Sequence, residues 1–373
     1  MMPIQMVDLK TQHEKLQPEL NQKILEVVEN ASYIKGKEVQ DFENELAAYL
    51  NVKHVIACAN GTDALQLAMM ALDLKPGDEV ITANFTYVAT AEIIALLQLK
   101  PVLVDVDRDT FNINIEEIRA AITPKTKAIV PVHLFGQCAE MESLLALAKE
   151  FNLYVIEDTA QAISAQYTFS NGTKAMAGTM GDIGTTSFFP SKNLGCMGDG
   201  GAVFTNSDAL AEKLRIIANH GQTKMYYHDF IGVNSRLDTI QAAVLRIKLR
   251  KLDEYCQSRA KAAKYYDEYF GNIKELIIPV RSKKSSHVFH QYVLKTNGID
   301  RDALKEFLNK KDIPCNIYYP VPLNKQKAYW DNSRIFTNTD YLCDIVFALP
   351  MHTELNEDQQ QYIVKEVIEF IKK

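Results

Sequence analysis

Lys192 is the residue whose surroundings most favour chemistry, because it is the only charged side chain between Ile183 and Gly198. Apolar and small neighbours keep water away from an ammonium group, lower its pKa and leave an amine that can attack a carbonyl carbon. The best-known use of such an amine is a Schiff base with pyridoxal phosphate (PLP). A lysine that extends from a loop to the surface is the alternative interpretation.

Two adjacent acids, Glu157 and Asp158, directly follow the apolar run Leu153–Ile156. In open α/β sheets a ligand binds beyond the carboxyl ends of the strands, so one of these acids is expected to face a crevice. A buried carboxylate opposite a pyridine nitrogen keeps that nitrogen protonated, which lets the ring accept electrons. The alternative is an acid that caps the following helix.

The segment Asn60–Leu65 follows one predicted strand and opens a predicted helix. Backbone N–H groups at a helix N-terminus stabilise an anion, so a phosphate group fits there. Alternatively, Thr62 or Asp63 serves only as a helix cap. The segment lacks the P-loop pattern, and the glycines after Lys192 do not form a dinucleotide fingerprint, which argues against a nicotinamide-dependent oxidoreductase.

Two further side chains suit a flat or an anionic ligand. Tyr87 could lie against a flat ring, although packing in the core is the commoner position for an aromatic residue at the start of a helix. Arg236 carries a planar fork that suits a carboxylate or a phosphate, with a salt bridge to Asp238 or another acid as the alternative. The histidines lack the spacing of metal ligands, so no metal is implied.

These residues are expected to lie on a large α/β domain, because short runs rich in Val and Ile alternate with helical patterns from about Lys53 to about Asn206. This alternation is typical of βα units around a largely parallel sheet. The predicted strands are His54–Ala57, Glu79–Thr82, Pro101–Asp105, Ala128–Val132, Leu153–Ile156 and Gly201–Thr205. The predicted helices include Thr62–Leu72, Tyr87–Leu97 and Met141–Glu150.

The rest of the chain predicts a second, smaller domain. After Asp238 a long, charged amphipathic pattern through Tyr269 indicates a helix that links the two domains. We expect a large PLP-binding domain over residues 1–250 and a compact C-terminal α+β domain over residues 251–373. The predicted elements of the second domain are the strand Gln291–Leu294 and the helices Arg301–Lys311 and Glu357–Ile371.

Composition excludes several classes of protein. The chain has 373 residues and a formal net charge of −6, which argues against a surface that binds nucleic acid. It shows neither a secretory signal nor an apolar run near the roughly 20 residues that span a bilayer, so a cytoplasmic protein without a membrane segment is expected. The six cysteines are scattered without a C-x-x-C pair, which indicates buried thiols.

A set of ordered motifs extends over most of the chain. The motifs are Ala59-Asn-Gly-Thr-Asp-Ala-Leu65, Phe85-Thr-Tyr-Val-Ala-Thr-Ala-Glu92, Pro131-Val-His-Leu-Phe-Gly-Gln137, Ile156-Glu-Asp-Thr-Ala-Gln161, Ser187-Phe-Phe-Pro-Ser-Lys192, Gly198-Asp-Gly-Gly-Ala202 and Asn234-Ser-Arg-Leu-Asp238. Together they resemble the DegT/DnrJ/EryC1/StrS family of sugar aminotransferases. The resemblance implies the aspartate-aminotransferase fold, which is PLP-dependent transferase fold type I, and a homodimer whose active sites lie at the subunit interface.

The resemblance also implies roles for individual residues. Lys192 would form the Schiff base with PLP, Asp158 would bind the pyridinium nitrogen, and Gln161 would approach the ring hydroxyl. Tyr87 would stack on the ring. The phosphate group would be held by Gly61, Thr62, Ser187 and Asn234 of the partner subunit. The sugar substrate would face Tyr318, Tyr319 and Arg236 of the partner subunit.

Within the family, three segments look most like bacterial enzymes that aminate UDP-2-acetamido-2-deoxy-3-oxo-D-glucuronate. They are Ala57-Cys-Ala-Asn-Gly-Thr-Asp-Ala-Leu-Gln66, Gly195-Cys-Met-Gly-Asp-Gly-Gly201 and Tyr319-Pro-Val-Pro-Leu-Asn-Lys-Gln326. Those enzymes convert L-glutamate to 2-oxoglutarate, carry the amino group as pyridoxamine phosphate (PMP), and supply precursors of O-antigen and related surface polysaccharides. This chain has Tyr318 where such relatives often carry histidine, which leaves the exact sugar open.

Three alternatives stay open at this point. The acceptor could be another 3-keto or 4-keto sugar linked to dTDP or UDP. A PLP- or PMP-dependent sugar dehydratase shares the fold, but in that branch histidine replaces the Schiff-base lysine, whereas Lys192 is present here. A regulatory protein could use the same fold without catalysis, since a fold does not determine a function.

Overall fold

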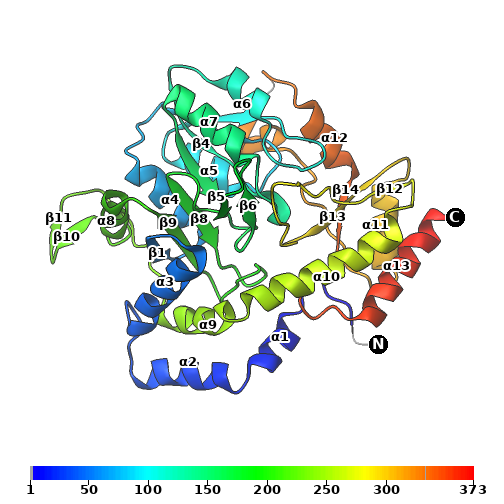
Figure 1. The fold of residues 1–373 in the computed structure, drawn as a ribbon, viewed down its shortest axis with the longest axis horizontal. Helices are drawn as coiled ribbons and strands as arrows, with labels where there is room; N and C mark the ends of the chain where they lie inside the picture. The colour runs from blue at the N-terminus through cyan, green and yellow to red at the C-terminus, as the bar shows by residue number, and fades with distance from the viewer. Residues whose placement is uncertain (1–2, 332) are drawn as a thin grey trace.

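The computed structural model describes residues 3–331 and 333–373, and its centre is a seven-stranded sheet (Figure 1). The strand order is β1-β9-β8-β5-β4-β2-β3; β9 runs antiparallel to both neighbours and the other pairings are parallel. The strands are β1 (His54–Cys58), β2 (Glu79–Ala83), β3 (Lys100–Val104), β4 (Thr126–Val130), β5 (Tyr154–Asp158), β8 (Ile183–Ser187) and β9 (Gly201–Thr205). The prediction of a largely parallel α/β sheet is confirmed.

Helices cover both faces of this sheet, so successive strand residues belong to different apolar cores. On β1, for example, Ile56 packs in one core, whereas Val55 and Ala57 pack in another on the opposite face. The first face is covered by α4 (Gly61–Ala71), α5 (Ala89–Leu96) and α8 (Asp208–Ile217). The opposite face is covered by α3 (Lys37–Leu50), α6 (Ile115–Ala121), α7 (Met141–Phe151) and α9 (Thr239–Leu249).

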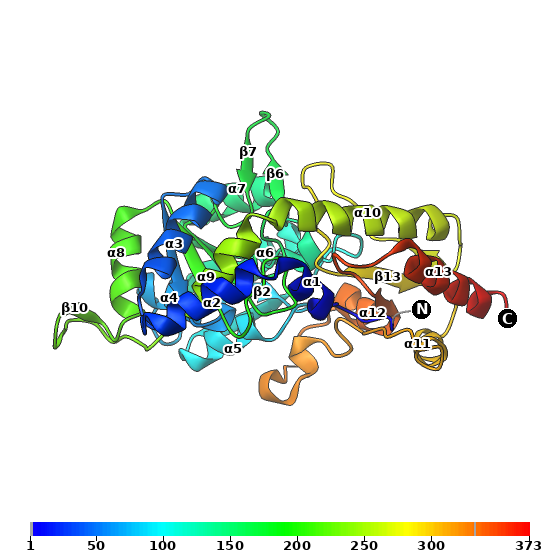
Figure 2. The ribbon, with the colours of Figure 1, turned by 90° about the horizontal axis from the view of Figure 1, so that it is seen from below.

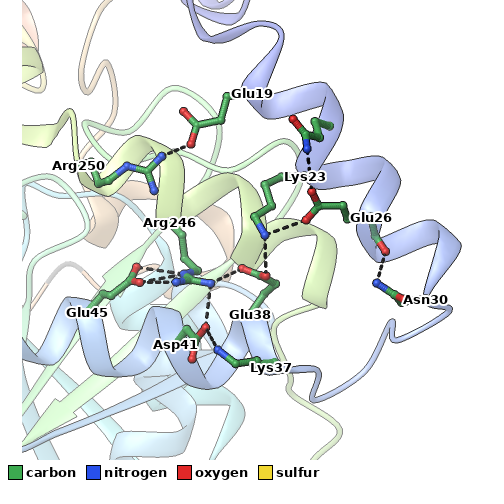
Figure 3. Close-up of polar contacts among 11 residues, drawn as sticks. Glu19, Lys23, Glu26, Asn30, Lys37, Glu38, Asp41, Glu45, Arg246 and Arg250 are labelled. Atoms are coloured by element: carbon green, nitrogen blue, oxygen red, sulfur yellow. Dashed lines mark hydrogen bonds and ion pairs between the residues drawn. The ribbon is translucent and has the colours of Figure 1, made fainter.

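α3 is held to α9 by a network of ion pairs around Arg246 (Figure 3). The guanidinium of Arg246 lies 2.5 Å from a carboxylate oxygen of Glu38, 2.9 Å from Asp41 and 2.5 Å from Glu45. Partly buried networks of this kind fix geometry better than isolated surface pairs do. They join α3 to α9, and α1 (Leu9–Leu16) and α2 (Glu19–Glu29) precede them in the chain.

The predicted linking helix is in fact two helices. α9 ends at Leu249, and α10 (Leu252–Phe270) begins after Arg250 and Lys251. The prediction of one charged amphipathic helix was wrong for its first part, because α9 packs against α2 and α3 and is largely buried, down to its lysine Lys248.

The C-terminal region is built on a second, antiparallel sheet of three strands. One face of this sheet packs in a core that includes Tyr266, Leu294 and Phe347, whereas Val293 and Val346 on its other face belong to a core of the large sheet. A division of the chain into two domains near residue 250 remains our prediction. The elements are β12 (Leu276–Ile277), β13 (Tyr292–Thr296), β14 (Val346–Leu349), α11 (Arg301–Asn309), α12 (Thr337–Ile345) and α13 (Glu357–Ile371).

Two small hairpins protrude from the molecule (Figure 2). The one that contains β10, here called the arm, extends far from the rest of the chain. This arm is formed by β10 (Gln222–Lys224) and β11 (Tyr227–His228), and the other hairpin by β6 (Gln166–Thr168) and β7 (Lys174–Met176). Apolar side chains on and beside the arm are exposed, including Met225 (70%), Tyr226 (82%) and Ile231 (88%). Within the described residues, no helix is long and apolar enough to cross a membrane.

Candidate active site

Lys192 lies on the loop between β8 and β9, beyond the carboxyl end of β8. The loop is fixed on both sides of the lysine, because the Lys192 N–H donates to Phe189 O (2.8 Å) and the Asn193 side chain donates to Val288 O (2.9 Å). Protein atoms around the ammonium keep water away from it and lower the Lys192 pKa to about 8, although the charge of Asp158 acts in the opposite direction. The Lys192 side chain is half-buried, and its lowered pKa favours a reactive amine over the alternative of a lysine that extends from a loop to the surface.

This lowered pKa makes the reactivity of Lys192 depend on pH. A lysine with an ordinary pKa of 10.5 is protonated throughout the neutral range, whereas Lys192 loses its proton near pH 8 and is a neutral nucleophile above it. We expect the rate at which an aldehyde probe labels Lys192 to rise about tenfold per pH unit up to pH 8 and then to level off. Peptide-resolved mass spectrometry measures this rate; a rise that continues to pH 10 would contradict the desolvated site.

Asp158 is the acid that lies with Lys192, at the carboxyl end of the neighbouring strand β5. It is buried, and its carboxylate accepts hydrogen bonds from the Thr90 hydroxyl (3.1 Å) and the Ala160 N–H (3.0 Å). Burial raises the pKa of Asp158, and the nearby positive charge of Lys192 only partly offsets it. Among the described residues no cation lies within 4.0 Å of this carboxylate, so a cationic ligand atom would remove an electrostatic penalty.

The adjacent Glu157 points to the opposite side of β5 and is part of the scaffold. Its carboxylate accepts from His133 Nε2 (2.9 Å) and from the backbone N–H groups of Gly178 (2.9 Å), Met180 (2.7 Å) and Gly181 (2.6 Å). The Ala139 N–H donates to His133 Nδ1 (3.0 Å), so Nε2 carries the ring proton. Of the two predicted acids, Asp158 is therefore the one available to a ligand.

The N-terminus of α4 forms a second part of the site, next to the end of β8. A Cβ atom on Gly61 would lie 2.6 Å from the Cβ of Ser187, so only glycine allows this approach. The helix cap is Asn60, whose side chain accepts from the Asp63 N–H (2.8 Å). The alternative in which Thr62 or Asp63 caps the helix was wrong. The first N–H groups of α4 lie beside the Ser187 hydroxyl, an arrangement that suits a phosphate.

Gln161 and three aromatic residues lie along one side of the site. Gln161 Oε1 accepts from the Phe135 N–H (2.8 Å), so its amide nitrogen points into the site and donates to the Tyr319 hydroxyl (3.1 Å). Tyr87 is 59% exposed, with its ring centroid 6.5 Å from that of Tyr319, so core packing does not describe it. The hydroxyl of Tyr318 accepts from Asn316 Nδ2 (3.0 Å).

Asn234 and Arg236 do not join this cluster within one chain. Arg236 lines a separate cavity of about 480 Å³, and none of the described residues around that cavity is Lys192, Asp158 or Gln161. Its guanidinium donates to Asn219 Oδ1 (3.3 Å), and Asn234 forms a backbone bridge with the same residue. The alternative salt bridge between Arg236 and Asp238 is not formed among the described residues.

Sequence reasoning missed residues that position the cluster rather than form it. Thr90 on α5 donates to Asp158, and Asn193 fixes the loop of Lys192. Their signal was only their nearness in sequence to Tyr87 and Lys192, which does not reveal a contact. Cys196 is a buried thiol whose S–H can donate to either Phe188 O or Gly198 O (both 3.0 Å), and burial raises its pKa to about 11, so it stays unreactive.

A lysine with a lowered pKa beside a buried aspartate, at the carboxyl ends of two parallel strands, is an arrangement that suits a PLP-dependent transferase of fold type I. The model of the DegT/DnrJ/EryC1/StrS aminotransferase family matches residues 14–368, and the chain belongs to that family. It is an aminotransferase that uses PLP, and the expected family, fold and cofactor are confirmed.

Three curated relatives are each 44% identical to the chain. They are the pleiotropic regulatory protein of Geobacillus stearothermophilus (99% of both chains), the UDP-2-acetamido-2-deoxy-3-oxo-D-glucuronate aminotransferase of Pseudomonas aeruginosa (95% of this chain, 96% of that one) and the UDP-N-acetyl-3-dehydro-alpha-D-glucosamine 3-aminotransferase of Acidithiobacillus ferrooxidans (95% of both). Among solved structures, NtdA of Bacillus subtilis with bound PMP is 29% identical, with a TM-score of 0.89 over 96% of this chain and 82% of that one.

Proposed function

We propose that the chain transfers the amino group of L-glutamate to the keto group of a nucleotide-linked sugar. UDP-2-acetamido-2-deoxy-3-oxo-D-glucuronate is the acceptor with most support, because one of the 44% identical relatives carries that name and three segments of the sequence resemble such enzymes. The product would be a precursor of a surface polysaccharide such as O-antigen. The observation that carries the proposal is the Lys192–Asp158 pair at the ends of β8 and β5.

The residues of the cluster fit the groups of PLP one by one. The phosphate fits between the first turn of α4, at Gly61 and Thr62, and the Ser187 hydroxyl. The ring nitrogen fits Asp158, whose buried carboxylate gains a partner when that nitrogen carries a proton. The ring hydroxyl fits the side-chain amide of Gln161, and the face of the ring fits the exposed Tyr87.

In the reaction, bound PLP supplies a ring that accepts electrons from the substrate carbon. Asp158 holds the ring nitrogen in its protonated form, which is the form that accepts electrons best. Lys192 Nζ, once it is free, removes the proton from the amino acid carbon and delivers protons in the second half-reaction. A pKa of about 8 suits both directions of transfer near neutral pH.

We infer further that two copies of the chain share their active sites. Asn234 and Arg236 have side chains that bind phosphate and carboxylate, yet Arg236 lines a cavity whose lining does not include Lys192 of its own chain, and Asn234 pairs with Asn219 of the same cavity. They directly follow the protruding arm, whose apolar tip is exposed in a single chain. A second copy would cover the tip and receive these two residues at its own Lys192, as in an isologous dimer.

A panel of acceptors tests the proposed reaction. The purified protein is incubated with glutamate and UDP- or dTDP-linked 3-keto and 4-keto sugars, and the amino sugar is detected by mass. We expect the 3-keto uronate to give the highest kcat/KM, and the 3-keto sugar without the carboxylate to be the nearest competitor. A higher kcat/KM for a 4-keto or dTDP-linked sugar would replace our acceptor but keep the reaction class.

A regulatory role is the second candidate, because a relative of 44% identity over 99% of both chains is a pleiotropic regulatory protein. A regulator without catalysis has no need of a desolvated lysine and a buried, unpaired aspartate in one site. We therefore expect the chain to turn over glutamate in the presence of a keto sugar. A protein that binds PLP but forms no 2-oxoglutarate with any acceptor of the panel would favour the regulator.

A further inference from the structure

The cavity that contains Arg236 lies at the edge of the large sheet, between α3, β1 and the end of α8, at the end of the molecule opposite the C-terminus (Figure 1). Its volume of about 480 Å³ is within the usual range of ligand pockets, about 300–1,000 Å³. The cavity is open to solvent, and its charged lining residues are Lys35, Arg215, Arg236 and Glu43. Nothing in the proposed cofactor site uses Lys35 or Arg215.

The only acid that lines this cavity among the described residues is already paired. Glu43 accepts from the Arg215 guanidinium (2.8 Å) through one oxygen and from the Ala57 N–H (2.9 Å) through the other. Because the lining contains three cations and one carboxylate, the cavity has two excess positive charges. Within the described residues neither Lys35 nor Arg236 has an ion pair, so these two carry the excess.

The chain brings Lys35 and Arg236 together by backbone pairing of two distant loops. The Gly36 N–H donates to the Thr239 hydroxyl (3.1 Å), and the Thr239 N–H donates to Tyr33 O (2.9 Å). Lys35 itself has a φ of +53°, an uncommon value for a residue other than glycine. Nearby protein atoms, which displace water from the ammonium, and the positive charges of Arg236 and Arg215 lower the pKa of Lys35, so the cations are close enough to repel one another.

We propose that Lys35 and Arg236 together bind the diphosphate of the nucleotide-linked sugar, in the active site whose Lys192 belongs to the second copy of the chain. The dianionic diphosphate matches the two excess charges of the cavity. A lysine is a strong point charge for phosphate, and the arginine fork binds two phosphate oxygens at once. The inference rests on the proposed function and on the sharing of sites, and it assigns Lys35 as a specificity residue for the acceptor.

Replacement of Lys35 by glutamine tests the assignment without loss of the fold, because Lys35 is an exposed loop residue. We expect Lys35→Gln to raise the KM for the keto sugar about tenfold, the effect of one lost charge-assisted contact, and to raise the Kd of UDP by a similar factor. The KM for glutamate, which has no diphosphate, should change less than about twofold. Lys35→Arg should restore most of the affinity for UDP.

Lys37→Gln is the matched control, since Lys37 lies two residues away, is 81% exposed and pairs with Asp41 outside the cavity (Figure 3). It should leave every constant unchanged. An unchanged Kd of UDP in Lys35→Gln would overturn the diphosphate assignment. If the KM then rose only for the uronate acceptor, the ligand would be the sugar carboxylate instead. Calorimetric binding of UDP needs no turnover, so the assignment can fail or hold independently of the proposed reaction.

A mixed dimer tests whether Lys35 acts in the site of the other subunit. One subunit carries Lys192→Ala and the other Lys35→Gln, and the heterodimer is purified through two different affinity tags. Its one competent site combines Lys192 of one chain with Lys35 of the other, so we expect the wild-type KM at about half the wild-type rate. A KM as high as that of the Lys35→Gln homodimer would show that Lys35 serves its own chain and would overturn the shared arrangement.

Discussion

Replacement of Lys192 by alanine is expected to lower turnover by about 10³-fold or more while the fold is retained. In the proposed function two roles would be lost at once, because the same nitrogen would hold the cofactor between turnovers and move the proton at the substrate carbon. The loss should appear in kcat, since binding of the keto sugar does not depend on this amine. Lys192→Arg should fail in the same way, because a guanidinium stays protonated and cannot serve as the nucleophile.

The chain contains a matched control for this experiment. Lys248 on α9 is buried, and burial lowers its pKa to about 8 as well, but it has no place in the cluster around Asp158. Lys248→Met should keep turnover within about threefold, which would show that a desolvated lysine alone does not make a catalytic one. After borohydride reduction, the cofactor should be found only on the peptide that contains Lys192. Full turnover of Lys192→Ala would remove the assignment.

The strands that could be predicted are those whose composition matches their burial. Six strands were found with ends within two residues, because runs of Val and Ile are the usual signal of a buried parallel strand. The central strand β8 was missed, since Ile183-Gly-Thr-Thr-Ser187 contains few branched apolar residues. Its threonines are buried nevertheless, because hydrogen bonds satisfy their hydroxyl groups. Thr185 donates to Glu157 O (3.1 Å) and Thr186 donates to Thr159 O (3.3 Å).

The direction of β9 and the break between α9 and α10 could not be predicted from local pattern. A buried strand has the same composition whether it runs parallel or antiparallel to its neighbours. The helix break falls between charged residues, Arg250 and Lys251, that continue the helical periodicity. Tertiary packing decides the helix break, because α9 packs against α2 and α3, whereas α10 packs in the core of the C-terminal sheet.

The residues of the candidate site also differ in how well the sequence predicts their positions. Lys192, Asp158 and the N-terminus of α4 were predictable because each follows a strand, and strand ends meet at one edge of a sheet. The cavity of Lys35 and Arg236 was not predictable. It depends on two loops, about 200 residues apart in the sequence, that pair through their backbones. The place of Arg236 relative to a substrate depends further on a second copy of the chain, and it remains a proposal.

Asp158→Asn and Glu157→Gln are expected to give opposite results, although the two acids are adjacent on β5. Asn cannot hold a proton on the ring nitrogen, so Asp158→Asn should lower kcat by about 10²–10³-fold. The free energy of unfolding of the cofactor-free protein should not fall, because burial already raises the pKa of Asp158 and the neutral amide avoids that penalty. Rapid kinetics and urea unfolding measure the two effects separately.

Glu157→Gln should instead reduce stability by about 3 kcal/mol and leave turnover of the folded protein within about threefold. The amide places its NH₂ group against the N–H donors of Met180 and Gly181, or against Gly178 and His133 if it turns over. Either orientation leaves buried donors without an acceptor. The midpoint of urea unfolding should fall while its slope stays constant. A large loss of kcat in Glu157→Gln with normal stability would mean that the two acids have been assigned the wrong way round.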